Sequence, residues 1–130
     1  MVAGGLDGIV TVAGPSTFDA DKKYGGQSAS VRKTYQMFLD WLNNERGGLT
    51  VGNKRYGMRI VLVDTGSSKQ LSTNATAHAI RRGRADFAIT EYSSSLGLYS
   101  AKQSYAERKI MVTWGCSSTG VHNQNNLTVR

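Results

Sequence analysis

The sequence predicts an α/β fold, a doubly wound and mostly parallel sheet with helices on both faces. Short apolar runs rich in β-branched residues alternate with helical stretches of about 10–15 residues, which is typical of βαβ units with right-handed crossovers. The apolar runs are nearly continuous, as expected for strands buried on both faces. A chain of 130 residues with 39% hydrophobic content is long enough for one ordinary core. We therefore expect residues 1–130 to form a single α/β domain.

The first unit is a strand followed by a long helix. Residues 8–13 are apolar and β-branched, and Gly14-Pro15-Ser16-Thr17 predicts a loop directly after them. Residues 27–44 carry apolar side chains at spacings of three and four, which indicates an amphipathic helix that ends at Gly47-Gly48. The apolar positions of that helix are Val31, Tyr35, Phe38, Leu39 and Leu42.

The second unit begins with a strand over residues 56–64, which ends on Asp64. Ser72-Thr73-Asn74 then offers side chains suited to cap the start of a helix that closes at Gly83. The third unit comprises a strand at residues 86–89, a helix at 96–108 and a strand at 110–113. A final strand is expected at 127–129.

Hydroxyl-bearing and small residues follow both strands of the third unit. Residues 90–95 read Thr-Glu-Tyr-Ser-Ser-Ser, and residues 114–119 read Trp-Gly-Cys-Ser-Ser-Thr. Two parallel strands joined by a helix place their carboxyl ends side by side, where open α/β sheets bind ligands. Ser94 or Ser95 is suited to cap the intervening helix, and open N–H groups there favour an anion. The sequence thus predicts a binding site without an evident catalyst.

The charge of the chain gives no specific partner. Sixteen basic and nine acidic side chains leave a net charge of +7. The basic residues are scattered apart from Arg81-Arg82-Gly83-Arg84, and cations at a helix end interact favourably with the helix dipole. We therefore expect no nucleic-acid partner. No apolar stretch approaches the roughly 20 residues that span a bilayer, so we expect no membrane insertion, and the first five residues show no signal-peptide pattern.

Residues that could support catalysis or cofactor binding lack the necessary companions. Cys116 is the single cysteine, and His78 and His122 form no recognised nucleophile pattern with it, which favours a structural cysteine. One cysteine and two distant histidines also provide no metal-ligand set with a known spacing. Glu91 and Glu107 are isolated carboxylates with no visible acid–base partner. We expect no metal and no cofactor.

Asp64 could suggest a dinucleotide-binding or phospho-acceptor domain, since it ends a strand. The first loop lacks a GxGxxG pattern, and no acidic pair follows the first strand. Asp64 is therefore expected to cap the loop before Ser67-Ser68.

Five short motifs occur in a characteristic order along the chain: Ala13-Gly14-Pro15, Tyr24-Gly25-Gly26, Asn43-Asn44-Glu45-Arg46-Gly47-Gly48-Leu49, Val61-Leu62-Val63-Asp64 and Ser93-Ser94-Ser95. In that order they resemble the type I periplasmic binding proteins for branched-chain amino acids, amides or urea. Residues 114–119, continuing to Asn126-Leu127-Thr128-Val129-Arg130, resemble a related segment of the extracellular ligand-binding domains of amino-acid receptors. The resemblance covers nearly the whole chain.

The resemblance implies a flavodoxin-like amino-terminal lobe of a protein that traps ligand between two hinged lobes. Arg130 falls about where such a chain first crosses to the second lobe, so the sequence is expected to be a fragment of a two-lobed protein. A transporter or receptor partner and a periplasmic or extracellular location are implied in the same way. Carried over by position, the ligand-binding residues are Tyr24, Ser93, Ser94, Gly115 and Ser117. Tyr92, which stands at a strand end with an apolar face and a polar tip, and Cys116, which lies in the loop of Gly115 and Ser117, complete the expected ligand-binding set.

Three functional hypotheses remain open at this point. The leading one is a non-catalytic lobe that binds an amino acid, an amide or a similar small polar solute. The second is a homodimeric assembly module without a ligand site of its own, because an isolated lobe exposes the face intended for its partner lobe. The third is an enzyme of flavodoxin-like fold, for which the sequence offers no nucleophile–base pair and no phosphate loop.

Overall fold

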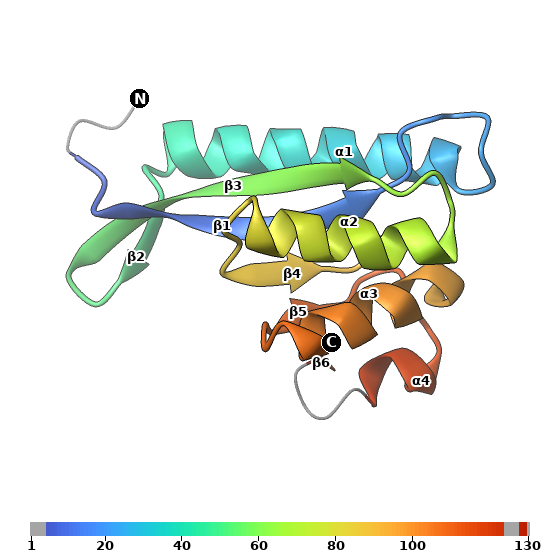
Figure 1. Cartoon of the computed structure of the whole chain (residues 1–130). Coiled ribbons are helices and arrows are strands. Elements are labelled where there is room, and N and C mark those ends of the chain that lie inside the picture. Colours follow the sequence, from blue (N-terminus) through green and yellow to red (C-terminus); the bar gives the residue numbers. More distant parts are fainter. Residues whose placement is uncertain (1–4, 124–127, 130) are drawn as a thin grey trace.

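The computed structural model describes residues 5–123, 128 and 129, which form a twisted sheet flanked by helices (Figure 1). Six strands lie in the order β2-β3-β1-β4-β5-β6, and β2 is antiparallel to its neighbour while the other pairs are parallel. The doubly wound, mostly parallel α/β architecture is thereby confirmed. The elements are β1 (Gly8–Ser16), α1 (Gly25–Asp40), a π-helical turn (Trp41–Glu45), β2 (Leu49–Val51), β3 (Lys54–Asp64), α2 (Lys69–Arg81), β4 (Phe87–Ile89), α3 (Ser94–Ala106), β5 (Met111–Val112), α4 (Thr119–His122) and β6 (Thr128–Val129).

The core lies between the sheet and helices α2 and α3, which cover the same face (Figure 1). Small side chains dominate it, so the helices pack closely on the strands. Met111 on β5 is the largest fully buried side chain in this cluster. The other buried members are Ala13, Ala79, Ile80, Ala85, Ala88, Ala101 and Val121.

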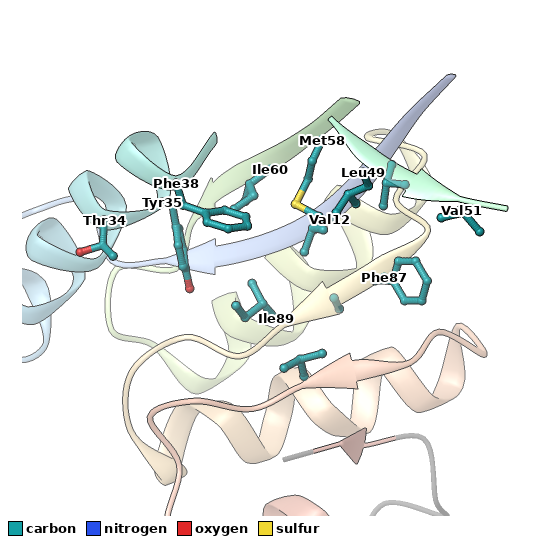
Figure 2. Close-up of a pocket in the computed structure, with 13 residues that line it drawn as sticks. Val12, Thr34, Tyr35, Phe38, Leu49, Val51, Met58, Ile60, Phe87 and Ile89 are labelled. Carbon is teal, nitrogen blue, oxygen red and sulfur yellow. The ribbon is translucent and has the colours of Figure 1, made fainter. Parts of the chain in front are cut away.

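The opposite face of the sheet is covered by α1 along part of its width only. An apolar hollow of about 600 Å³ lies there, between α1, β2 and the outer face of β1, β3, β4 and β5 (Figure 2). Phe87 on β4 and Val112 on β5 border it and are 40% and 42% exposed. The expectation of helices on both faces is met, but on this side the cover is partial among the described residues.

The first strand is longer than the sequence suggested, because Gly14, Pro15 and Ser16 continue it rather than starting a loop. A proline in a central strand usually removes a ladder hydrogen bond. The backbone of Thr11 faces β4, where it bonds to Asp86, and strand periodicity places the nitrogen of Pro15 on that side. Since β4 pairs with β1 at Val12 and Ala13, Pro15 lies beyond that ladder and interrupts no bond.

The segment after α1 also differs from the sequence prediction. Strand β2 pairs with the start of β3 as a short antiparallel hairpin, in which Leu49 lies opposite Tyr56 and Val51 lies opposite Lys54. Gly52 opens the two-residue turn with a φ of 62°, a conformation that glycine adopts without strain. The Gly52-Asn53 pair is a recognised hairpin signal that the sequence analysis passed over.

Both later helices begin earlier than predicted. Ser68, not Ser72, caps α2: its hydroxyl accepts from the Leu71 N–H at 3.3 Å. Helix α3 starts at Ser94 rather than at residue 96. Thr128–Val129 pairs with β5 as expected for the last strand, whereas Leu127 lies outside the described residues.

Candidate functional site

The candidate site lies at the carboxyl edge of the sheet, where the loops after β1, β3, β4 and β5 meet. Asp64 fixes the first two loops, because its Oδ1 accepts from the N–H groups of Phe18 and Gly66, each at 3.0 Å. The predicted role of Asp64 as a loop cap is therefore confirmed. Thr17 and Thr65, which follow β1 and β3, are fully buried and lie 3.1 Å apart through their hydroxyls.

Three aromatic side chains form a continuous row along this edge. The ring of Tyr24, after β1, meets that of Tyr92, after β4, in an edge-on contact with centroids 5.8 Å apart. Tyr92 in turn lies 6.0 Å from Trp114, which follows β5. The Trp114 indole N–H donates to the Thr90 carbonyl at 2.6 Å and holds the end of the row in place. Residues from three separate strand ends thus build one surface with apolar faces and polar tips.

Serine hydroxyls lie beside the first ring of this row. Ser95 Oγ lies 3.3 Å from the Tyr24 hydroxyl and 3.0 Å from Ser93 Oγ. Hydrogen bonds with Ser93 and Ser95, followed by the influence of Lys23, lower the pKa of Tyr24 to about 8. The Lys23 ammonium lies 5.1 Å from the centre of the same ring. Tyr24 is therefore a phenol that starts to ionise close to neutral pH.

Ser93 has a backbone conformation that only glycine adopts freely. Its φ of 84° and ψ of 140° lie outside the regions open to ordinary residues. Such strain often occurs at ligand-binding sites. Ser93 occupies the N-cap position of α3, yet neither Ser94 nor Ser95 caps that helix as predicted, and Ser93 makes no side-chain cap bond.

The first turn of α3 points its N–H groups at the same place. The first backbone bond of this helix runs from the Gly97 N–H to the Ser93 carbonyl at 2.9 Å. The N–H groups of residues 94–96 precede that bond and have no intrahelical acceptor. Ser94 instead accepts from the Ser118 N–H at 3.0 Å and so joins α3 to the loop after β5. Together with the dipole of α3, this arrangement favours a negatively charged or carbonyl oxygen.

The loop after β5 provides the opposite wall. The Gly115 carbonyl accepts from the Ser93 N–H at 3.3 Å, and a side chain at Gly115 would press on the Tyr92 ring. Ser117 is exposed and lines a hollow of about 260 Å³ with Trp114, Cys116 and His122. The structure therefore brings the sequence-predicted residues from both clusters into one neighbourhood, with Ser117 at its margin.

Cys116 serves this site through packing. Its thiol donates to the Ser93 carbonyl at 3.4 Å and lies against Gly97 of α3, where any side chain would collide with the sulfur. Burial raises the pKa of the Cys116 thiol, which disfavours the thiolate form. His122 Nε2 lies 3.2 Å from the Cys116 carbonyl oxygen, so its ring bonds to the backbone rather than to the thiol. The geometry agrees with a structural cysteine.

One residue that the sequence analysis set aside is central to this edge. Glu91 was expected to be an isolated carboxylate, but it is 3% exposed and contacts two hydroxyls. Ser72 Oγ on α2 lies 2.5 Å from Glu91 Oε1, and Thr65 Oγ1 lies 2.7 Å from Oε2. No feature of the local sequence reveals this burial, because the partners lie 19 and 26 residues away.

The described residues include neither a metal-binding cluster nor a membrane-spanning helix. Among them, no group of three or more His, Cys, Asp or Glu side chains is placed to hold a metal ion. None of the helices formed by these residues is long and apolar enough to cross a membrane.

Comparison with known proteins identifies the fold. No family model and no curated protein matches the sequence. Among solved structures, the chain is similar to the branched-chain amino acid transporter substrate-binding protein LivJ from Streptococcus pneumoniae in complex with isoleucine, with a TM-score of 0.77, 11% identity, and coverage of 92% of this chain and 32% of that one. The leucine-binding protein LivK from Thermotoga maritima gives a TM-score of 0.74 at 22% identity, covering 93% and 32%. An ABC-transporter solute-binding protein from Rhodopseudomonas palustris in complex with 4-hydroxybenzoate gives a TM-score of 0.72 at 15% identity. That similarity covers 94% of this chain and 31% of that one.

These similarities confirm the fold expected from the sequence resemblance, that of one lobe of a type I periplasmic binding protein. The chain spans about a third of the length of each of the three proteins.

Proposed function

We propose that this chain is a non-catalytic binding lobe that holds a small polar solute at the carboxyl edge of its sheet. The observation that carries the proposal is the convergence of the aromatic row with Ser93, Ser95 and the open first turn of α3. The N–H groups and serine hydroxyls suit a carboxylate or amide oxygen. The rings of Tyr24 and Tyr92 suit the remainder of an amino acid or a short amide.

The fold neighbours support this role, because they are solute-binding proteins for amino acids and aromatic acids. In an intact two-lobed protein, ligand would shift an open–closed equilibrium that a transporter or receptor reads. A periplasmic or extracellular location belongs to the same proposal. One lobe supplies contacts on one side of the ligand only, so we expect a Kd in the millimolar range, which corresponds to about −4 kcal/mol.

The test is a ¹⁵N–¹H correlation spectrum of the chain, titrated with a millimolar panel of amino acids, amides, urea and hydroxybenzoates. A ligand of the proposed site would shift the amides of Tyr24, residues 93–95 and Gly115, and the double variant Ser93→Ala/Ser95→Ala would lose the response. Ser30→Ala is the matched control, because Ser30 is exposed on α1 and its hydroxyl bonds to the Gly26 carbonyl. Shifts elsewhere, or none with any member of the panel, would contradict the proposal.

A second candidate is a homodimeric assembly module, and the exposed apolar face beside α1 favours it. Phe87 and Val112, which line the hollow there, are 40% and 42% exposed (Figure 2). A second copy covering this face would remove those side chains from water. Sedimentation equilibrium at micromolar concentration distinguishes the candidates: Val112→Asp should abolish such a dimer, whereas a monomer at every concentration excludes it.

A further inference from the structure

Glu91 is a buried acid with no basic partner. The ion pair present among the described residues joins Arg81 and Glu107, and the contacts of the Glu91 carboxyl are the hydroxyls of Ser72 and Thr65. An ionised carboxylate in such surroundings carries a large desolvation cost. The surroundings of Glu91 therefore disfavour its ionised form.

The groups that face Glu91 from neighbouring elements do not compensate a negative charge. Asp64, at the end of β3, is itself acidic, and Cys116, after β5, directs its thiol toward the Glu91 carbonyl at 3.7 Å. The cation that contacts the same loops is Arg32 of α1, and it donates to Ser16 Oγ and to the Thr17 carbonyl rather than to Glu91. Lys69 of α2 and Lys102 of α3 lie over the Tyr99 ring.

The hydroxyls that contact Glu91 supply no counter-charge. Glu91 Oε1 accepts from Ser72 Oγ at 2.5 Å, and Oε2 accepts from Thr65 Oγ1 at 2.7 Å. Thr65 Oγ1 lies 3.1 Å from Thr17 Oγ1, which lies 3.0 Å from Ser67 Oγ. Glu91 is therefore one link in a chain of neutral side chains, and a protonated carboxyl fits a buried position of this kind better than an ionised one.

The contacts accommodate a protonated Glu91. Its hydroxyl can donate to Ser72 Oγ, because the Ser72 hydroxyl has a second acceptor in the Ser68 carbonyl at 2.9 Å. Thr65 continues to donate to the other Glu91 oxygen. Burial acts in the same direction, because it raises the pKa of Glu91 against the opposing effect of the two hydroxyls.

The chain of contacts connects the loops that carry the candidate site. Ser67 Oγ, at one end of it, accepts from the Tyr24 N–H at 3.2 Å. Glu91 directly precedes Tyr92 and Ser93. Thr17 and Thr65 lie between Ser67 and Glu91 and join the loops after β1 and β3. Tyr24 and Tyr92, which adjoin these two residues, contact each other edge-on with centroids 5.8 Å apart, so the chain restrains how closely they approach.

We propose that Glu91 is a neutral carboxylic acid at neutral pH and acts as a positioning residue that holds the Tyr24 and Ser93 loops in register. This inference rests on the proposed function for its consequence, since those loops form the proposed ligand site. Ionisation would place an uncompensated charge among these neutral contacts, and the entry of water to solvate it would loosen the connection between the two loops.

The experiment follows the Glu91 carboxyl carbon by ¹³C NMR as the pH is raised, without ligand and in a Tyr24→Phe background that removes the phenol's own titration. The expected result is a carboxyl carbon that keeps the chemical shift of its protonated form through neutral pH. A model glutamate, by contrast, titrates at a pH of about 4.3. The backbone amides of residues 24, 67 and 93 should move with the same midpoint. In Glu91→Gln those amides should show no such step, because an amide donates to Ser72 and accepts from Thr65 without titrating.

A Glu91 carbon that titrates below neutral pH would overturn the proposal, as would a higher midpoint that the three loop amides do not share. If Glu91→Gln is too unstable to study, the titration of the Glu91 carboxyl and the three loop amides without that substitution still tests the proposal. Because no ligand is used, this result is independent of the solute panel. A confirmed neutral Glu91 beside a failed panel would reject the ligand site alone.

Discussion

The strained conformation of Ser93 predicts that a glycine there makes the chain more stable. A non-glycine residue in this region costs on the order of 1–3 kcal/mol, and glycine loses about 0.5–1 kcal/mol through its greater freedom in the unfolded chain. The net gain for Ser93→Gly is therefore about 0.5–2 kcal/mol. Ser93→Ala is the matched control, because it removes the same hydroxyl but keeps the strained φ of 84°.

Urea unfolding of the two variants measures this difference directly, with a linear extrapolation for each. For a chain of this length, the expected gain corresponds to about 3–5 °C in Tm per kcal/mol. Both variants lose the 3.0 Å contact between Ser93 and Ser95, and both should move the pKa of Tyr24 back toward 10, since Ser93 is the largest cause of its lowering. If Ser93→Gly is no more stable than Ser93→Ala, the strain argument is wrong.

Four further outcomes are expected. Affinity for an anionic solute should fall as pH rises through about 8, where Tyr24 becomes a phenolate, and calorimetry should find this step missing in Tyr24→Phe. Gly97→Ala should destabilise the chain by about 1–3 kcal/mol, because the new methyl group meets Cys116 Sγ, and adding Cys116→Ala should restore most of the loss. Met111→Ala should cost about 2–5 kcal/mol in urea unfolding, because Met111 is fully buried, while the exposed Met37→Ala should be nearly neutral. Since burial raises the pKa of folded Glu91, the folded chain keeps a proton that the unfolded chain releases above about 4.3. The free energy of unfolding should therefore fall as pH rises from there to the folded-state pKa, by at most about 1.4 kcal/mol per pH unit, and this contribution should be missing in Glu91→Gln.

Sequence patterns predicted the parts of the fold that depend on local order. The apolar runs predicted strands where the structure has β1, β3, β4 and β5. The helical spacing of apolar residues likewise predicted α1. The errors lie where a tertiary contact decides. Ser72 looked like a helix cap, but its side chain faces the buried Glu91 carboxyl, and Ser68 caps α2 instead. Pro15 suggested a loop, but β1 tolerates it because β4 pairs with β1 only at Val12 and Ala13. The sequence does not reveal where that pairing stops.

The candidate site was predictable as a location and less so as a geometry. Hydroxyl clusters after two neighbouring strands sufficed to place residues 93–95 near Gly115. The row formed by Tyr24, Tyr92 and Trp114 depends on side-chain directions at three strand ends, which no local pattern specifies. The strain at Ser93 is likewise invisible in a serine-rich sequence, since serine gives no signal for a positive φ.

The hydroxyls at this edge of the sheet fall into a buried set and an outer set. Thr17, Thr65 and Ser72 are buried and form hydrogen bonds with each other or with Glu91, so they can fix the loops but cannot meet a solute. Ser93 and Ser95 lie with Tyr24 in the proposed ligand site. Replacing a buried member should therefore change stability first, and replacing an outer member should change affinity first. The same serine- and threonine-rich composition thus provides both the rigidity of the edge and the hydroxyls of the proposed site.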